Sequence, residues 1–374
     1  MILSLLPLLL PALPAAPPQQ DEPIYLIQAD GVIGADGALI EDGQVMLRGG
    51  KVMAVGAKIA APSSAVKLRL AGVLAPGFVD AWSRVGTEHG VSEASSYLTP
   101  SLLAVDALDR DDDSWEARLA HGITAVHLVP AVLDQEGDPI QVLAGWSGVV
   151  GCQGRERVMS ARARQTIGLL SGPYRSREGG PSSLAGAAEA LGAALTADPK
   201  AAGEAALVVV DSTEGINAAR AALAGVDLAW IAAGDPATFG GALRGQLLGL
   251  PVVDDGNWSA RQVETWRRLH AAEVRIAFGT GDGGPWNGPG ALRTSAMAFA
   301  RATGDAGAAM AAVTRNAADL AGLGRSYGRL APGARADLVL WSGHPLDASS
   351  RVRSVMIAGR TVWSAAPREG EDEE

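Results

Sequence analysis

The stretch that decides the fold is PGFVDAWSRVG, residues 76–86. It opens with Pro76 and Gly77, which are turn-forming residues, and continues with Phe78 and Val79, which have the character of a buried strand. Further along the chain, short apolar runs alternate with helix-like segments. Because this alternation is typical of a parallel sheet with helical crossovers, we expect residues 76–86 to supply the first strand of an α/β fold.

The later elements are predicted from the same patterns. The expected strands are ITAVHLV (123–129), ALVVVD (206–211), LAWIAA (228–233), LPVVDD (250–255) and VRIAFG (274–279). The expected helices are residues 115–121, 183–195, 215–223, 260–272, 291–303 and 306–320. The glycine-rich residues 134–180 are harder to assign, and the third and fourth strands are expected within them.

The two ends of the chain have a different pattern. Residues 24–74 and 328–364 contain short apolar runs broken by glycine, which are typical of antiparallel strands in a small β-module. Residues 1–16 form an apolar run that is too short to span a bilayer and ends in small residues, as in a signal peptide. Residues 17–23 read as a linker and residues 365–374 as an acidic tail. We therefore expect an exported protein, periplasmic or extracellular, with an uncleaved anchor or a misassigned start codon as the alternatives.

The composition excludes several classes of partner. A formal net charge of −10 argues against nucleic acid and anionic membranes, which need clustered Lys and Arg. Cys152 is the only cysteine, so no intrachain disulfide forms, and we expect it to be a buried hydrophobe rather than a nucleophile.

His121 is expected to end a helix as a cation, where it would complement the helix dipole.

A second motif lies near the other end, where residues 311–347 read AAVTRNAADLAGLGRSYGRLAPGARADLVLWSGHPLD. This segment and residues 76–86 resemble the closing and opening motifs of the amidohydrolase superfamily, including its imidazolonepropionase and dihydroorotase-like branches. The two motifs bracket roughly 250 residues, the usual size of a (β/α)8 barrel. The resemblance implies a TIM-like barrel at residues 75–327. It also implies a composite β-sandwich built from residues 24–74 and 328–364.

The resemblance also implies where a catalytic divalent metal would be held. The family has two histidines at the positions of Trp82 and Arg84, and neither replacement can ligate a metal, since neither side chain offers a lone pair. At the ends of the fifth and sixth strands, Asp211 and Ala233 stand where the family has histidine. At the end of the eighth, Gly281 stands where the family has its aspartate, with Asp282 one residue later.

A rebuilt metal site is an alternative, because carboxylates with one imidazole can hold Mn, Mg or Zn. Its candidate ligands are Glu88, His89, His127, Asp211, Glu214, Asp254, Asp255 and Asp282. For the carboxylates the competing interpretation is helix capping or a solvated rim, and for His127 it is a structural histidine.

Three functional hypotheses follow. The first is a catalytically inactive or ligand-binding pseudoenzyme without a cofactor, in which Trp82, Arg84 and Asp211 line a pocket for a small anionic ligand, or Trp82 simply packs the space. The second is an active hydrolase of non-peptide carbon–nitrogen bonds, with a rebuilt Zn or Mn site, Asp282 as catalytic residue and an amide substrate. The third is a structural partner of an active paralogue, in a homo- or hetero-oligomer.

Overall fold

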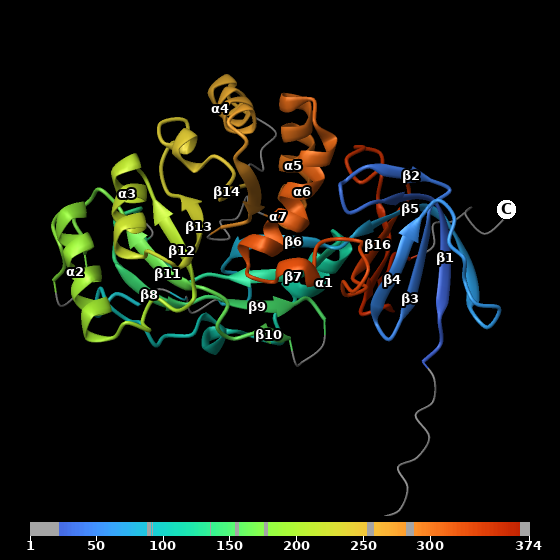
Figure 1. The fold of residues 1–374 in the computed structure, drawn as a ribbon, viewed down its shortest axis with the longest axis horizontal. Coiled ribbons are helices and arrows are strands. Elements are labelled where there is room, and N and C mark those ends of the chain that lie inside the picture. The colour runs from blue at the N-terminus through green and yellow to red at the C-terminus, as the bar shows by residue number, and fades with distance from the viewer. Residues whose placement is uncertain are drawn as a thin grey trace, which may run out of the picture.

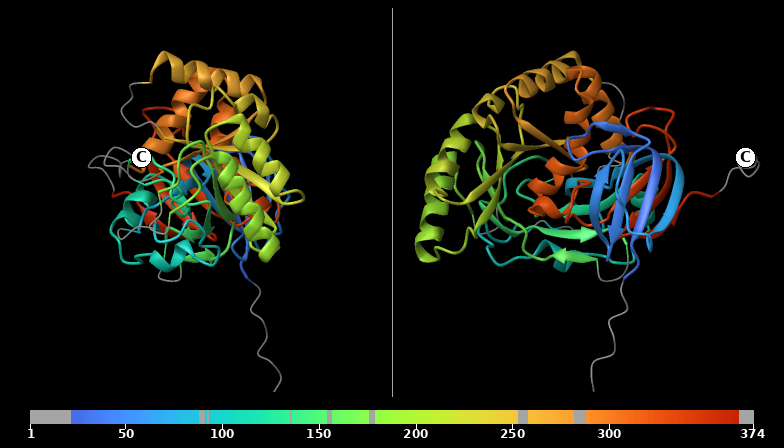
Figure 2. Two further views of the ribbon diagram at one scale, coloured as in Figure 1. Left: turned by 90° about the vertical axis from the view of Figure 1, so that its left-hand side faces the viewer. Right: turned by 45° about the vertical axis from the view of Figure 1, so that its right-hand side comes forward.

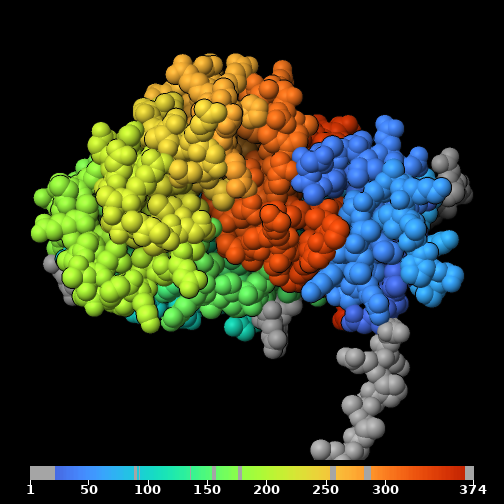
Figure 3. Space-filling model, in the orientation of Figure 1, coloured from blue at the N-terminus to red at the C-terminus, as the bar shows by residue number. Residues whose placement is uncertain are grey.

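The computed structural model describes residues 22–87, 91, 93–134, 136–153, 157–175, 179–252, 258–281 and 288–366. The chain forms a ring of strands with helices outside it, and a β-module at one end (Figures 1 and 2). In the space-filling view, the N-terminal strands in blue adjoin the orange region that contains α5–α7 (Figure 3). No helix in the described part of the chain is long and apolar enough to cross a membrane.

Two sheets make up the ring. The first contains, in spatial order, β10 (Val158–Ser160), β9 (Gly148–Gly151), β7 (Ile123–Leu128) and β6 (Phe78–Ser83). The second contains, in spatial order, β15 (Arg275–Gly279), β14 (Leu247–Pro251), β13 (Asp227–Ala232), β12 (Ala205–Val210), β11 (Gln165–Leu169) and β8 (Leu143–Trp146). The near-continuous apolar sequences of β12 and β13 fit strands that are covered on both faces.

The two sheets meet at two places. Only Ser147 separates β8 from β9, so these strands form one kinked segment that pairs with β11 through its first half and with β7 through its second. On the opposite side, a single parallel bridge joins Ser83 to Gly281. There the Arg84 backbone amide donates to the Gly281 carbonyl at 3.1 Å, and the Gly281 amide donates to the Trp82 backbone carbonyl at 3.1 Å. These contacts give the TIM-like arrangement, although the ladder between β6 and β15 is short.

The third position of the ring departs from the expected parallel pattern. The β8–β9 segment runs antiparallel to both of its neighbours, β7 and β11. Residues 129–142, which connect β7 to β8, contain no helix in their described part. Since a parallel connection needs a crossover, usually a helix, this short link returns the chain in the opposite direction.

Most helices begin at the expected residues because polar side chains cap them. The helices are α1 (Ser114–Ala120), α2 (Leu184–Ala197), α3 (Thr213–Ala222), α4 (Ala260–Ala271), α5 (Gly290–Thr303), α6 (Ala306–Val313) and α7 (Arg315–Leu320). Short 3-10 turns lie at η1 (Ala104–Ala107), η2 (Gly240–Leu243) and η3 (Gly324–Ser326). Ser183, Ser212, Ser259 and Asp305 each accept a hydrogen bond from a backbone amide in the first turn that follows.

Two predicted boundaries were wrong. The helix expected over residues 306–320 is broken at Thr314, which has φ −129° and ψ −98° and donates its hydroxyl hydrogen back to the Met310 carbonyl at 2.6 Å. The strand expected at residues 250–255 lies at Leu247–Pro251 instead, where it pairs with Arg275–Gly279. Beyond Pro251, the Val252 amide still donates to the Gly279 carbonyl at 3.0 Å.

The β-module is one eight-stranded sheet made from both ends of the chain. It contains β1 (Tyr25–Ile33), β2 (Leu39–Glu41), β3 (Gln44–Arg48), β4 (Lys51–Gly56), β5 (Val66–Pro76), β16 (Leu338–Trp341), β17 (Val352–Ile357) and β18 (Arg360–Ser364). The N- and C-terminal parts join where β5 pairs antiparallel with β16. Because β5 ends at Pro76 and β6 begins at Phe78, this module leads directly into the ring.

A buried carboxylate supports the short seam between β6 and β15. Asp80 is fully buried and accepts hydrogen bonds from the Thr280 amide at 2.9 Å and the Thr280 hydroxyl at 2.6 Å. The buried Arg118 guanidinium of α1 lies 3.7 Å away. Burial raises the pKa of Asp80, while Arg118 and Thr280 act in the opposite direction. One side chain thus connects the first strand, the end of the last strand and the first helix.

A buried histidine supports the other junction. The Nδ1 and Nε2 atoms of His127 each lie 2.8 Å from a partner, the Ala81 carbonyl oxygen and the Ser147 hydroxyl oxygen respectively. Because a carbonyl can only accept, Nδ1 carries the hydrogen. The single hydroxyl hydrogen of Ser147 is shared between Nε2 and the Arg164 carbonyl oxygen, which lies 3.0 Å from the Ser147 oxygen. The Ser147 oxygen also accepts from the Arg164 amide at 3.1 Å. Desolvation lowers the pKa of His127 to about 3, so the ring is neutral and structural.

We expect Asp80→Asn to lower the free energy of unfolding by about 3–5 kcal/mol, because it leaves Arg118 as a buried cation without its carboxylate. The measurement is urea denaturation at neutral pH. The double variant Asp80→Asn, Arg118→Met should recover much of this loss, since both charges are then gone. Glu264→Gln is the control; it breaks an exposed pair with Arg268 and should change stability by less than about 1 kcal/mol. A single Asp80→Asn variant as stable as the wild type would contradict this role.

The second prediction concerns acid stability. The folded-state pKa of His127 is lowered, so the unfolded chain binds a proton between about pH 6.5 and pH 3 that the folded chain does not. The stabilisation is therefore complete above pH 6.5 and is lost as the pH falls, by up to about 5 kcal/mol. In denaturation series at several pH values, the stability difference between wild type and His127→Gln should shrink over this window. A difference independent of pH would refute the neutral, buried state of His127.

Candidate functional site

A small cavity lies where the carboxyl ends of the first, second, fifth and sixth ring strands meet. Its volume is about 60 Å³, and its lining includes Trp82, Arg84, Val129, Val209 and Ala233. In barrel proteins the carboxyl ends of the strands form the functional face. A cavity of this volume holds roughly two water molecules, however, and small-molecule sites are usually about 300 Å³ or more.

The indole of Trp82 explains why this cavity is small. A Cβ atom at Gly279 would lie 2.2 Å from Trp82 Cδ1, and one at Gly281 would lie 3.0 Å from Trp82 Cη2. The ring therefore packs directly against the two glycines at the end of β15. Gly281 also has φ +66°, a conformation that favours glycine. An aspartate at this position, as in the family resemblance, would need the indole to shift by a few tenths of an ångström.

The other predicted pocket residue, Asp211, lies at the end of β12 but is held by a neighbouring strand end. Its two carboxylate oxygens accept hydrogen bonds from the Ser171 amide at 2.9 Å and the Ser171 hydroxyl at 3.0 Å. Ser171 follows β11, so this contact ties the fourth and fifth strand ends together. Asp211 is not among the described residues that line the small cavity. Trp82 and Arg84 do line it.

The structure describes only part of the alternative metal cluster. Asp282, the candidate catalytic residue, lies outside the described residues, as do Glu88, His89, Asp254 and Asp255. Among the candidates that are described, His127 is committed to Ala81 and Ser147, and Asp211 to Ser171. Glu214 lies in the first turn of α3.

The residues present at the strand ends do not fit the divalent metal that the family resemblance implies. Trp82 and Arg84 have no lone pair to donate, and a guanidinium repels a metal ion. Ala233 offers a methyl group and Gly281 no side chain. Within the described ranges, no group of three or more His, Cys, Asp or Glu side chains is placed to hold a metal.

Two other predictions about single residues can be compared with the structure. Cys152 is buried, and burial raises its pKa to about 12, so the thiol is an unreactive hydrophobe as expected. His121 does follow the last turn of α1, but its expected cationic role was wrong. Burial, together with the nearby Arg293 and Arg118, lowers the pKa of His121, which favours the neutral imidazole.

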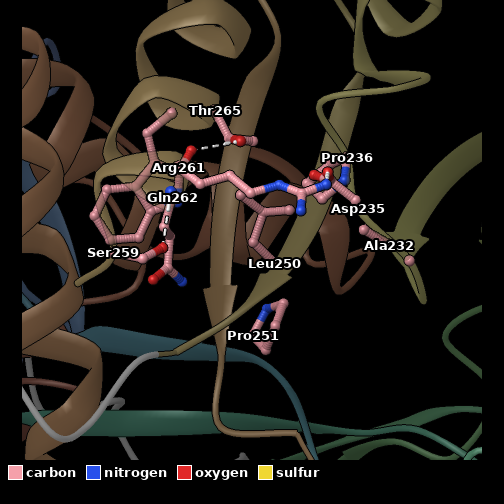
Figure 4. Close-up of a pocket in the computed structure, with 11 residues that line it drawn as sticks. Ala232, Asp235, Pro236, Leu250, Pro251, Ser259, Arg261, Gln262 and Thr265 are labelled. Carbon is pink, nitrogen blue, oxygen red and sulfur yellow. Dashed lines mark hydrogen bonds and ion pairs between the residues drawn. The ribbon is translucent and has the colours of Figure 1, made fainter. Parts of the chain in front are cut away.

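A larger cavity lies outside the ring, between the ends of β13 and β14 and the start of α4 (Figure 4). Its volume is about 260 Å³, roughly four times that of the central cavity. Ala232 lines both cavities, so the end of β13 separates them. The remaining walls include Leu250, Pro251, Gln262 and Trp266.

An ion pair closes one side of this cavity. Asp235, in the loop after β13, accepts a hydrogen bond from the Ala237 amide at 3.0 Å and pairs with Arg261 of α4. The bonds from Ala237 and Arg261 hold the pKa of Asp235 below its usual value. In Figure 4, Arg261 reaches across to Asp235, while Ser259 and Gln262 lie together away from that pair. The ion pair thus connects the loop to the helix.

Sequence analysis did not identify this second site. The Ser259 to Gln262 segment, SARQ, matches the Ser-x-x-Gln pattern of a capping box, which marks the start of a helix. The helix was expected at residues 260–272 and lies at Ala260–Ala271. The capping pattern carried no information about the cavity, which depends on how α4 packs against strand ends far away in the sequence.

Comparison with known proteins is consistent with this architecture. The model of the amidohydrolase family matches residues 200–362, downstream of the altered first-strand motif. A search of curated proteins found no match. Among solved structures, an amidohydrolase from Thermotoga maritima MSB8 has a TM-score of 0.75 and 24% sequence identity, covering 91% of this chain and all of the other.

Two further structures share the fold at lower identity. A putative prolidase from Bifidobacterium longum has a TM-score of 0.56 and 16% identity, covering 93% of this chain and 97% of its own. Ochratoxinase from A. niger has a TM-score of 0.58 and 15% identity, covering 95% of this chain and 99% of its own. The C-terminal part of the chain thus matches the amidohydrolase family model, and the chain shares the fold of solved amidohydrolases over nine tenths of its length.

Proposed function

We propose that this protein is a pseudoenzyme, an amidohydrolase-fold protein that has lost metal-dependent hydrolysis. The observation that carries the proposal is the contact of the Trp82 indole with Gly279 and Gly281. Trp82 and Gly281 replace a metal ligand and the aspartate of the family pattern, and the two replacements are sterically matched. The proposed loss of activity therefore involves repacking of the space at the strand ends by Trp82, and not only the absence of one metal ligand.

The small central cavity supports a packing role for Trp82 over a ligand-binding role. A volume of about 60 Å³ leaves no room for a ring-sized substrate beside the indole. Trp82 Nε1 is buried and, among the described residues, has no hydrogen-bond partner. Leaving a buried donor unpaired costs about 1–3 kcal/mol, so the contact of the ring with its surroundings must offset that cost.

Similarity to solved hydrolases supports one alternative function, that of an active hydrolase. The solved structures that share this fold include a putative prolidase and ochratoxinase. By analogy, this chain would be a hydrolase of carbon–nitrogen bonds if a metal site were rebuilt with Asp282 and its neighbours. Fold similarity alone does not decide this, because function depends on the site residues.

The first test is elemental analysis of the full chain, purified without chelator or affinity metal. We expect Zn, Mn, Fe and Ni at background level, and the same result after soaking in excess Zn and Mn, because the described strand ends offer no ligand set. Near-stoichiometric metal that resists dialysis would reject the pseudoenzyme and favour the hydrolase.

The second test is a double-mutant cycle between Trp82 and Gly281. Gly281→Ala should destabilise the wild type through both the indole contact and the positive φ, whereas in a Trp82→Ala background only the φ cost, about 1–2 kcal/mol, should remain. Trp82→Ala alone should cost about 3–5 kcal/mol. The measurement is denaturant unfolding of the four proteins. Strictly additive effects would show that the two replacements are not sterically coupled.

A further inference from the structure

The first half of strand β5 is paired on one side only. Along residues 66–70, β5 pairs in parallel with β1, whereas its antiparallel pairing with β16 covers only residues 73–76. Within the described part of the chain, no other strand pairs with residues 66–70. Val66 and Leu68 are 44% and 40% exposed, although both are apolar. Residues 66–70 therefore form an open edge of the β-module.

The backbone groups that face the open edge can be assigned from one hydrogen bond. The Val66 amide donates at 2.8 Å to the carbonyl of the residue that precedes β1. Because successive amides of a strand point to opposite sides, the amides and carbonyls of Lys67 and Arg69 point away from β1. The next group on that side, the Ala71 carbonyl, accepts from the Arg353 side chain of β17 at 3.2 Å. The open edge thus offers two donors and two acceptors and ends at Ala71.

The two faces of the open edge differ in chemistry. Val66, Leu68 and the half-buried Leu70 share one face, since alternate residues of a strand point the same way. Leu68 lies beside Ile27 of β1, which belongs to the apolar core of the module. The two intervening residues are cations and lie on the other face. A strand laid alongside would therefore meet apolar side chains on one face and positive charge on the other.

Part of the positive charge at the open edge has no acidic partner. Arg69 lies 3.3 Å from Asp30 and 3.5 Å from Asp42, so its charge is balanced within the module. Among the described residues, neither Lys67 nor Arg353 forms an ion pair, and Arg353 contacts a backbone carbonyl instead. These two cations favour an acidic segment beside the edge.

A second copy of this chain fits the open edge poorly. In an antiparallel pair of two such edges centred on Leu68, Lys67 of each copy would lie directly opposite Arg69 of the other. A pair centred on Lys67 or on Arg69 would place identical cations opposite each other. Like charges directly opposite destabilise a strand pair, and lysine on an edge strand is a common protection against such pairing. The charges therefore favour a different partner over self-association.

We propose that the open edge of β5 binds an extended segment of another protein by strand addition, and that this segment alternates apolar and acidic residues. Its backbone would pair with the amide and carbonyl groups of Lys67 and Arg69. Its apolar side chains would lie beside Val66 and Leu68, and its carboxylates beside Lys67. This surface belongs to the β-module, so the proposal does not depend on whether the central metal site is lost.

The experiment uses the full chain and three blocked peptides at concentrations at which each is monomeric. The test peptide is Ac-SVEVEVS-NH2. Of the two control peptides, Ac-SVKVKVS-NH2 reverses the charge, and Ac-SVVVEES-NH2 keeps the composition but breaks the alternation. Binding is measured by isothermal titration, and hydrogen exchange reports on the amides of Lys67 and Arg69.

Three variants separate the contributions of backbone and charge. Lys67→Pro removes the amide hydrogen that faces the open edge and leaves the pairing with β1, a position at which strands tolerate proline. Lys67→Gln removes the charge alone. Met53→Gln is the matched control, because Met53 is an exposed apolar residue of a different strand, β4.

We expect the test peptide to bind the wild type and Met53→Gln equally and to slow exchange at Lys67 and Arg69. Lys67→Gln should bind about threefold more weakly through the lost charge, and Lys67→Pro about tenfold more weakly through the lost hydrogen bond. Both control peptides should bind at least about tenfold more weakly than the test peptide.

Equal binding of the three peptides, or no binding of the test peptide at millimolar concentration, would overturn the proposal. Unchanged affinity in both Lys67 variants would do so as well. Slow exchange at Lys67 and Arg69 without any peptide would overturn it in favour of another occupant. That occupant would be the acidic segment 367–374 if neutralising its carboxylates restored fast exchange, and a second copy if dilution did.

Discussion

The buried carboxylate of Asp80 is the contact on which the ring of strands depends. The seam between β6 and β15 has one backbone bridge rather than a continuous ladder, so side chains have to hold the first and last strands together. Asp80 does this through Thr280 and also faces Arg118 of α1. Because this role is structural, Asp80 does not require a metal at the neighbouring positions Trp82 and Arg84. Within residues 76–86, the side chain that holds the strands together is therefore a different one from those that would bind a metal.

Much of the fold could be predicted from the sequence, because it depends on local patterns. Apolar runs located β7, β12, β13 and β15, and the expected helices at residues 183–195 and 260–272 located α2 and α4. The antiparallel β8–β9 segment was not predicted, since strand direction depends on a pairing partner and not on composition. The seventh strand was misplaced because Val252 and Val253 look more strand-like than the LLGLP segment that pairs.

The candidate site could be predicted only in part. The resemblance implies that Trp82 and Gly281 stand where the family has a metal ligand and an aspartate, and the sequence treats the two positions separately. Their contact, with Cη2 of the indole 3.0 Å from where a Cβ at Gly281 would stand, exists only in three dimensions. Close packing makes such replacements interdependent, because a centre filled by an indole has no space for a carboxylate. Likewise, Ser259 and Gln262 read only as a helix start, and nothing in the sequence places them opposite Leu250.

The end of β13 divides the functional face of the ring into two compartments with different properties. Inside, the indole has reduced the space to about 60 Å³, whereas outside a cavity of about 260 Å³ remains against α4. The Asp235–Arg261 pair at its edge is exposed, with 30% and 78% of the side chains accessible, so it adds little to stability. It connects the loop after β13 to α4 across one side of the opening.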